Sequence, residues 1–134
     1  MDTLFLDANI LFSAAYRESA GLLKFWGLSN AKLITSAYAI EEARRNLKEN
    51  KQQDRLLDLI KRIKIINEIS IAHYVQDIKL AQKDLPILAA AIAGKADYLI
   101  TGDIKDFGRF FTKKIQGVII LPPIEYFKLL NYSL

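Results

Sequence analysis

Four acidic side chains stand beside apolar segments of this sequence, where an unpaired charge is costly to bury. Asp7 directly follows the run TLFL, and Asp103 follows YLIT with one glycine between them. Asp84 precedes LPILAAAIA, and Glu42 lies in ITSAYAIEEARRNL. Carboxylate oxygens are the ligands that hard divalent cations prefer, and such cations activate water for attack on phosphate esters. Brought together, these acids would form a site for Mg²⁺ or Mn²⁺.

The composition limits the other kinds of site that the chain can build. It has 134 residues, no cysteine and one histidine, His73. Thiolate zinc sites, disulfides and sites with several histidines are therefore excluded. The formal net charge of +4 permits a nucleic-acid partner without requiring one. The start MDTLFLDANI lacks the basic region of a signal peptide, and no apolar run is long enough to span a membrane, so we expect a cytoplasmic protein with no membrane contact.

The length suits one domain over residues 1–134, and the apolar pattern predicts strands that alternate with helices. The predicted strands are 3–6, 32–35, 64–66, 98–101 and 117–120. The predicted helices are 9–17, 19–28, 36–49, 53–63, 84–94 and 122–130, with a less regular helical segment at 70–82. Wholly apolar strands separated by helices are typical of a parallel sheet covered on both faces. The expected fold is therefore an α/β protein, a three-layer α/β/α sandwich that resembles the Rossmann arrangement.

This fold places the acids at one edge, because the carboxyl ends of parallel strands meet there. Asp7 and Asp103 end two strands, and Asp84 heads a helix that leads into the second of them. Ordinary structural roles remain open for each acid. Asp84 also fits a helix N-cap, Asp103 and Asp106 fit caps of a short helix over 104–111, and Glu42 fits a solvated helix position.

The segments LDANIL, ITSAYAIEEARRNL and KDLPILAAAIAGKADYLITGDIKDF together resemble the PIN-domain family of metal-dependent ribonucleases. The chain is most similar to bacterial and archaeal members that act as VapC-like toxins of toxin–antitoxin pairs. The resemblance implies an endoribonuclease that hydrolyses RNA phosphodiester bonds with one or two Mg²⁺ or Mn²⁺ ions. It also implies a homodimer and a cognate antitoxin as partners.

The resemblance also implies roles for individual residues. The catalytic, metal-binding acids would be Asp7, Glu42, Asp84 and Asp103, with Asp106 as a further metal ligand. Asn9 and Thr101 would support the site. Glu41 competes with Glu42 for the helix position, although EARRNL matches the family pattern from Glu42.

Basic residues near the predicted acidic edge are candidates for contacts with RNA phosphates. Arg44, Lys48 and Lys51 fall at helical spacing on the predicted helix 36–49 and just beyond it, and Lys105 and Arg109 follow the GDIKDF segment together with Lys113 and Lys114. An ordinary solvated face explains these residues equally well.

Two other functions are alternatives to the nuclease interpretation. A HAD-type phosphatase needs an aspartate two residues after the first one, where this chain has Asn9. A non-catalytic PIN-like module that binds RNA or protein remains the alternative from another class, although a degenerate module is expected to lose some of its acids.

Overall fold

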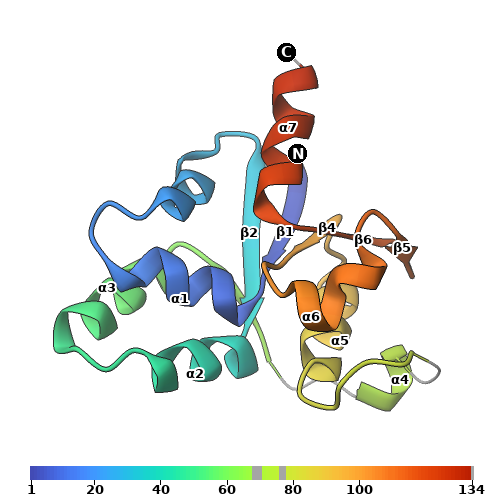
Figure 1. The fold of residues 1–134 in the computed structure, drawn as a ribbon, viewed down its shortest axis with the longest axis horizontal. Coiled ribbons are helices and arrows are strands. Elements are labelled where there is room, and N and C mark those ends of the chain that lie inside the picture. The colour runs from blue at the N-terminus through green and yellow to red at the C-terminus, as the bar shows by residue number, and fades with distance from the viewer. Residues whose placement is uncertain (68–70, 76–77, 134) are drawn as a thin grey trace.

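A six-stranded sheet forms the centre of the protein, with the strand order β3-β2-β1-β4-β6-β5 (Figure 1). The structure is a computed structural model that describes residues 1–67, 71–75 and 78–133. The strands are β1 (Asp2–Leu6), β2 (Ala31–Ser36), β3 (Lys64–Ile66), β4 (Tyr98–Ile100), β5 (Lys114–Ile115) and β6 (Val118–Leu121). All neighbouring strands run parallel except β5 and β6, which pair antiparallel at one edge.

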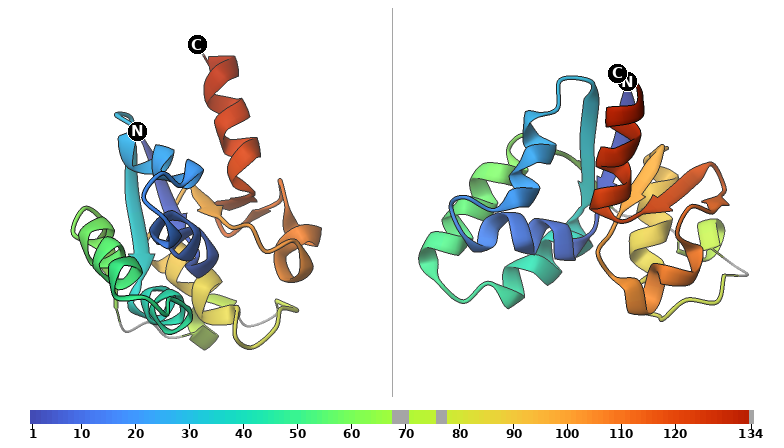
Figure 2. Two further views of the ribbon diagram at one scale, coloured as in Figure 1. Left: turned by 60° about the vertical axis from the view of Figure 1, so that its left-hand side comes forward. Right: turned by 45° about the horizontal axis from the view of Figure 1, so that its top comes forward.

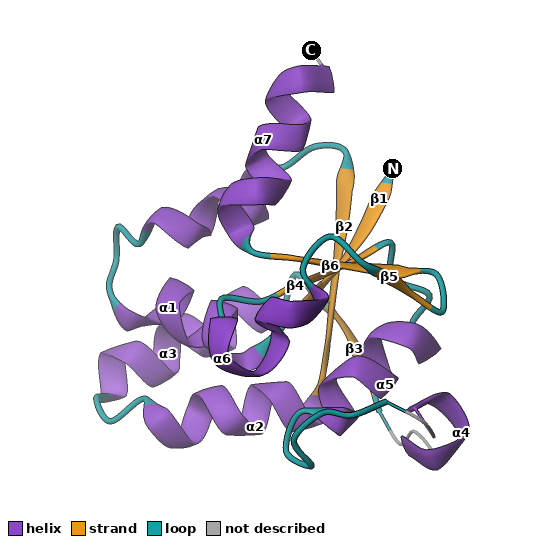
Figure 3. Cartoon of the chain, turned by 45° about the vertical axis from the view of Figure 1, so that its right-hand side comes forward, coloured by secondary structure: helices purple, strands orange, loops and turns teal. Residues whose placement is uncertain are grey.

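Helices cover both faces of the sheet, as the apolar strands predict (Figures 1 and 2). The α-helices are α1 (Ala8–Tyr16), α2 (Ala37–Asn46), α3 (Asn50–Ile60), α4 (Ile71–Val75), α5 (Leu85–Ala93), α6 (Ile104–Phe107) and α7 (Pro123–Ser133). Two 3₁₀ helices complete the described elements, η1 (Gly21–Gly27) and η2 (Gly108–Phe110). Helices α1, α2 and α3 gather on one side of β1 and β2, and α4 and α5 lie on the other side (Figure 3).

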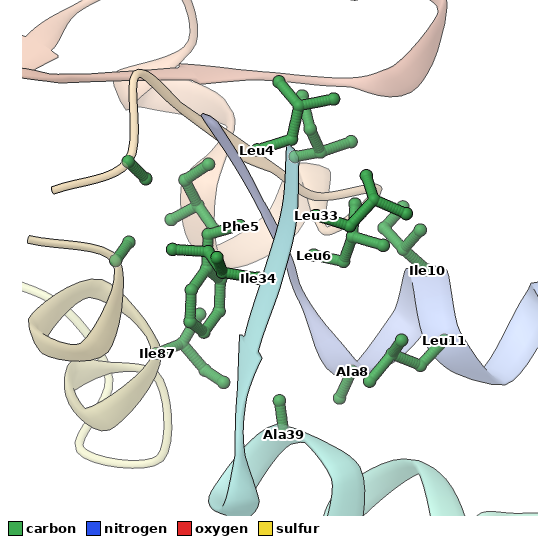
Figure 4. Close-up of a cluster of buried hydrophobic side chains, with 14 of the residues drawn as sticks. Leu4, Phe5, Leu6, Ala8, Ile10, Leu11, Leu33, Ile34, Ala39 and Ile87 are labelled. Carbon is green, nitrogen blue, oxygen red and sulfur yellow. The ribbon is translucent and has the colours of Figure 1, made fainter. Parts of the chain in front are cut away.

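Strand β1 shows why both faces must be covered. Leu4, Phe5 and Leu6 are successive residues and all three have no exposed surface. Successive strand residues point to opposite faces, so each face needs its own apolar layer. Phe5 points toward Ile87 of α5, whereas Leu6 lies on the side of α1 (Figure 4). The α/β/α sandwich predicted from the sequence is confirmed.

Helix α5 lies close against the sheet because its side chains are small. Five successive residues, Ile87 to Ala91, are buried, and three of them are alanines. The helix ends at Gly94, where a Cβ atom would lie 2.7 Å from the Ile34 side chain. This close approach is at the C-terminal end of α5. Asp84, at the other end of the helix, lines the same cavity as Asp7, which follows β1.

Two local predictions were wrong, and one short strand was missed. The predicted helix 36–49 ends at Asn46, because Leu47 is extended and a new helix begins after Glu49, whose N–H donates to the Gln52 side chain at 3.2 Å. The segment 19–28 contains a 3₁₀ helix bounded by two glycines rather than an α-helix. Strand β5 is only two residues long and was not predicted.

The predicted helix 70–82 is confirmed only over Ile71–Val75. Residues 70, 76 and 77 lie outside the described part of the chain, and residues 78–84 are not helical. Within the described ranges, no helix combines the length and the apolar character that a membrane crossing requires.

Candidate metal centre

A cavity of about 400 Å³ opens at the carboxyl edge of the sheet, between α1, α2 and the start of α5. Four acidic residues line it: Asp7, Glu42, Asp84 and Asp103. They come from four different elements, the end of β1, the middle of α2, the start of α5 and the start of α6. The structure thus brings together the four acids that the sequence analysis selected. Asn9 also lines the cavity.

Asp7 is held in place by a hydrogen-bond network that joins the ends of β1 and β4. Its Oδ1 accepts from the Ala8 N–H at 2.6 Å, and its Oδ2 accepts from the Thr101 hydroxyl at 2.7 Å and the Asn9 amide at 3.1 Å. The Gly102 N–H donates to the Asn9 Oδ1 at 2.8 Å, which fixes the orientation of that amide. The supporting positions Asn9 and Thr101 therefore contact Asp7 directly.

Only 4% of the surface of Asp7 is exposed, and this burial has the largest effect on its pKa. Burial raises the pKa of Asp7 to about 6, although its hydrogen bonds with Thr101 and Ala8 act in the opposite direction. The nearby carboxylates Glu42 and Asp103 raise this pKa further. The cavity therefore accumulates negative charge that nothing in the Asp7 network neutralises.

Asp84 stands at the N-cap position of α5, but its side chain makes no capping hydrogen bond. The residue is only 7% exposed, and its Oδ2 is buried with no hydrogen-bond partner in the described structure. A capping role therefore does not account for this carboxylate. A buried carboxylate oxygen without a partner is costly, and a cation in the cavity would satisfy it.

Three of the acids approach one another closely. One carboxylate oxygen from each of Asp84, Asp103 and Asp106 lies within 4.8 Å of the others. Burial and the adjacent Asp106 raise the pKa of Asp84, whereas the pKa of Asp106 is lowered by Asp84 and by Lys83. Opposite shifts of this kind are expected when two acids share one proton. Oxygen ligands at this spacing fit a hard cation such as Mg²⁺ or Mn²⁺.

Asp103 also has an ordinary structural role. Its Oδ1 accepts from the Asp106 N–H at 2.9 Å and caps α6, as one of the alternatives predicted. Its own N–H donates to the Thr101 hydroxyl at 3.1 Å. The cap uses Oδ1, which positions Asp103 beside Asp84.

Glu41 and Glu42 differ in their exposure, and of the two only Glu42 lines the cavity. Glu41 is exposed, and its carboxylate makes two hydrogen bonds with the guanidinium of Arg44, one of them at 2.8 Å. Glu42 is half-buried and lines the cavity. The buried stripe of α2 is formed by Ala39 and Ala43, which places Glu42 at its edge.

Two polar residues that line the cavity, and a tyrosine hydrogen-bonded to one of them, were missed by the sequence analysis. Lys83 lines the cavity, and its Nζ lies 3.4 Å from Asp106 Oδ2. The Tyr38 hydroxyl donates to the Lys83 carbonyl at 2.8 Å, and burial together with Glu42 raises the pKa of Tyr38 to about 12. Asn46 lines the cavity one helical turn after Glu42. That spacing of four residues was a usable signal for Asn46.

A family model described as the PIN domain matches residues 3–105 of this chain, which is most of its length. The chain belongs to the PIN-domain family. The match includes Asp7, Glu42, Asp84 and Asp103 and ends before Asp106. No curated protein gives a significant match to the chain.

Solved structures share the fold of this PIN domain. VapBC2 from Rickettsia felis, bound to a DNA fragment from its promoter, is similar with a TM-score of 0.67 and 22% identity, over 90% of this chain and 98% of that chain. A toxin–antitoxin complex from Klebsiella pneumoniae gives 0.64 and 27%, over 87% of this chain and 95% of the other. FitAcB from Neisseria gonorrhoeae gives 0.53 and 19%, over 90% and 98%.

The basic residues selected from the sequence lie on several different elements of the PIN domain. Arg44 lies on α2 and pairs with Glu41. Lys48 lies in the loop after α2 and donates to the Arg45 carbonyl, and Lys51 lies on α3. Their predicted alignment on one helix was wrong, because α2 ends before Lys48. Lys105 is exposed on α6.

Arg109 belongs to a separate basic hollow of about 410 Å³ near α6. Its guanidinium lies 4.7 Å from the centre of the Phe110 ring. Lys79, Lys113 and Lys114 line the same hollow. The 3₁₀ helix η2 follows α6 directly. Arg109 on η2 therefore comes just after the short helix that begins at the Asp103 cap and contains Asp106.

Proposed function

We propose that this PIN domain is a ribonuclease that depends on Mg²⁺ or Mn²⁺ and hydrolyses RNA phosphodiester bonds. The observation that carries the proposal is the unpartnered, buried Oδ2 of Asp84 in a cavity lined by three further acids. Membership of the PIN-domain family supports the same conclusion. Without a cation, the buried carboxylate of Asp84 can limit its cost only by sharing a proton with Asp106.

The acidic residues would have two roles, to hold the cation and to accept a proton. Asp84, Asp103 and Asp106 would hold the cation, because their oxygens already lie within 4.8 Å of one another. When bound, the cation would offset the acidic charge, lower the pKa of a water and stabilise the charge that develops on the phosphate. Asp7 and Glu42 line the same cavity, and one of them would accept a proton from the attacking water.

Substrate binding would use the basic residues that follow the acidic edge. Lys105 and Arg109 lie on the segment that begins with Asp103, and Arg109 shares its hollow with Lys79, Lys113 and Lys114. Contacts from such residues to RNA phosphates give affinity without sequence selectivity. Arg44 is already paired with Glu41, so we assign it a smaller contribution than Arg109.

We further propose that the protein is the toxin of a toxin–antitoxin pair, with a cognate antitoxin as partner and a homodimer as its assembly. Similarity to the Rickettsia felis VapBC2 and to the Klebsiella pneumoniae toxin–antitoxin complex supports this assignment. The testable consequence is growth arrest when the chain is expressed alone, and relief when the neighbouring gene is co-expressed.

Cleavage of a labelled single-stranded RNA in Mn²⁺ tests the nuclease directly. The wild type is expected to cleave, and Asp84→Asn is expected to lose the activity while remaining folded. Glu41→Gln is the matched control, because it also removes one carboxylate from this part of the protein but not from the cavity. Absence of cleavage by the wild type, with RNA binding retained, would favour the non-catalytic binding module.

A further inference from the structure

A second basic hollow lies at the opposite end of the strands from the acidic cavity. It has a volume of about 410 Å³ and lies between η1, the start of β2 and the turn that leads into β3. Strand β2 runs from this end toward α2 (Figure 1). The residues that line the two hollows therefore lie at opposite ends of β2.

The hollow exists because β3 is short. Strand β3 begins at Lys64, which pairs with Ile34 of β2. Among the described residues, the first half of β2, residues 31–33, therefore has no strand beside it on that side. An edge of this kind leaves backbone groups available to a ligand. Phe25 and Ile63 are buried and give the hollow an apolar floor.

The polar lining of the hollow carries one sign of charge. It consists of Lys32, Lys61, Arg62 and Lys64, and none of the ten lining residues is acidic. Lys61 is paired with Asp58 at 3.5 Å, but both side chains are highly exposed, which makes this pair weak. No ion pair involves Lys32 or Lys64 within the described residues.

A hydrogen bond orients the guanidinium of Arg62. One of its terminal nitrogens donates to the Trp26 carbonyl at 2.6 Å, and the Trp26 indole N–H donates to the Leu59 carbonyl at 3.1 Å. A guanidinium has five N–H donors, so several remain for an anion. The site therefore presents one oriented guanidinium and two unpaired ammonium groups to the same space.

We propose that this hollow binds the phosphate backbone of a polynucleotide, as a second anchoring site remote from the acidic cavity. Four cations exceed what one small phosphate requires, and such a phosphate would fill only a small part of the hollow. The open edge of β2 lets a chain continue past the site. The proposal does not depend on hydrolysis, because binding here leaves the acidic cavity untouched.

The protein carries its own probe for this site, since Trp26 is the single tryptophan and it lines the hollow. The full chain would be titrated in EDTA, which prevents hydrolysis, with an oligouridylate of eight nucleotides, uridine monophosphate and inorganic phosphate. Tryptophan fluorescence would be read at several salt concentrations. The oligonucleotide is expected to change the fluorescence at lower concentration than either small phosphate.

Variants assign the signal to the hollow. Lys32→Gln/Lys64→Gln is expected to weaken oligonucleotide binding about tenfold and to reduce the slope of log K against log salt by about 1.4. Lys32→Arg/Lys64→Arg keeps the charge and should retain binding. Lys95→Gln removes one positive charge from an exposed position after α5, on the other face of the sheet, so twice its effect gives the loss expected from net charge alone.

Three results would overturn the proposal. One is an unchanged Trp26 fluorescence with all three ligands. Another is a loss of binding free energy in the Gln double variant no greater than twice that of Lys95→Gln. The third is binding of uridine monophosphate or phosphate as tightly as the oligonucleotide, which would make the ligand a small phosphate compound. RNA cleavage is measured separately, so loss of the nuclease proposal would leave this result standing.

Discussion

The hydroxyl of Thr101 donates its single proton to Asp7, with 2.7 Å between Oγ1 and Oδ2. The direction of this bond is fixed, because the same hydroxyl accepts from the Asp103 N–H and from the Asn9 amide. Both neighbours are donors, so only Asp7 remains to receive the proton. Thr101 therefore recognises Asp7 in its ionised form.

Thr101→Val is expected to destabilise the protein by about 2 kcal/mol at pH 7.5, because it removes a donor from buried Asp7 and the acceptor of the Asp103 N–H. Chemical denaturation measures the loss. Thr101→Ser keeps the hydroxyl and should restore most of the stability. A loss in Thr101→Ser with none in Thr101→Val would show that the methyl group, not the hydroxyl, matters.

Asp84→Asn is expected to stabilise the metal-free protein by about 1 kcal/mol, or roughly 4 °C in melting temperature, because it removes a buried charge with an unpartnered oxygen. Mn²⁺ should raise the melting temperature of the wild type and have much less effect on the variant. Differential scanning fluorimetry with Mn²⁺ and with EDTA gives both values. A variant that gains as much from Mn²⁺ as the wild type contradicts the assignment of Asp84 as a ligand.

The stability of the metal-free protein should depend on pH through Asp7. Burial raises its pKa from 3.8 to about 6, so the folded state holds a proton that the unfolded state has lost between these values. The contribution of Asp7 is complete below pH 3.8 and is lost as the pH rises through 6, a change of about 3 kcal/mol.

The measurement for Asp7 is the difference in unfolding free energy between the wild type and Asp7→Asn from pH 4 to pH 7.5 in EDTA. The difference should move in favour of the variant as the pH rises, because Asn cannot ionise. A difference that stays constant over this range would mean that Asp7 titrates alike in both states.

Lys83→Gln is expected to tighten Mn²⁺ binding by about two- to fivefold, because the ammonium that lies 3.4 Å from Asp106 opposes the cation. Calorimetric titration with Mn²⁺ measures the change. Lys79→Gln removes the same charge from an exposed lysine outside the cavity and should leave the affinity nearly unchanged. Weaker binding in Lys83→Gln would instead make Lys83 a support of the site.

The sheet was predictable because wholly apolar strands require covered faces, and Leu4, Phe5 and Leu6 are indeed buried in succession. The position of Asp7 and Asp103 at one edge followed from the parallel topology alone. Their catalytic and ligand roles stay predictions. The pairing of Asp84 with Asp106 was not predictable, because it depends on how the start of α5 and the short helix α6 meet in the tertiary fold.

Two further features could not be predicted from local sequence patterns. Helical spacing of Arg44, Lys48 and Lys51 suggested one surface, but the interaction between Glu49 and Gln52 starts a new helix between them. Lys83 precedes Asp84 directly and looked like an ordinary loop cation. Its contact with Asp106 joins residues 23 positions apart and depends on the tertiary fold.

Thr101 and Asp7 are separated by 94 positions in the chain. Asp7 therefore cannot meet this hydroxyl until the chain through Thr101 has been made and has left the ribosome. A nascent chain that lacks residues 101–103 cannot assemble the acidic cavity. If the protein cleaves RNA, these first residues give it no activity until Asp103 has joined them.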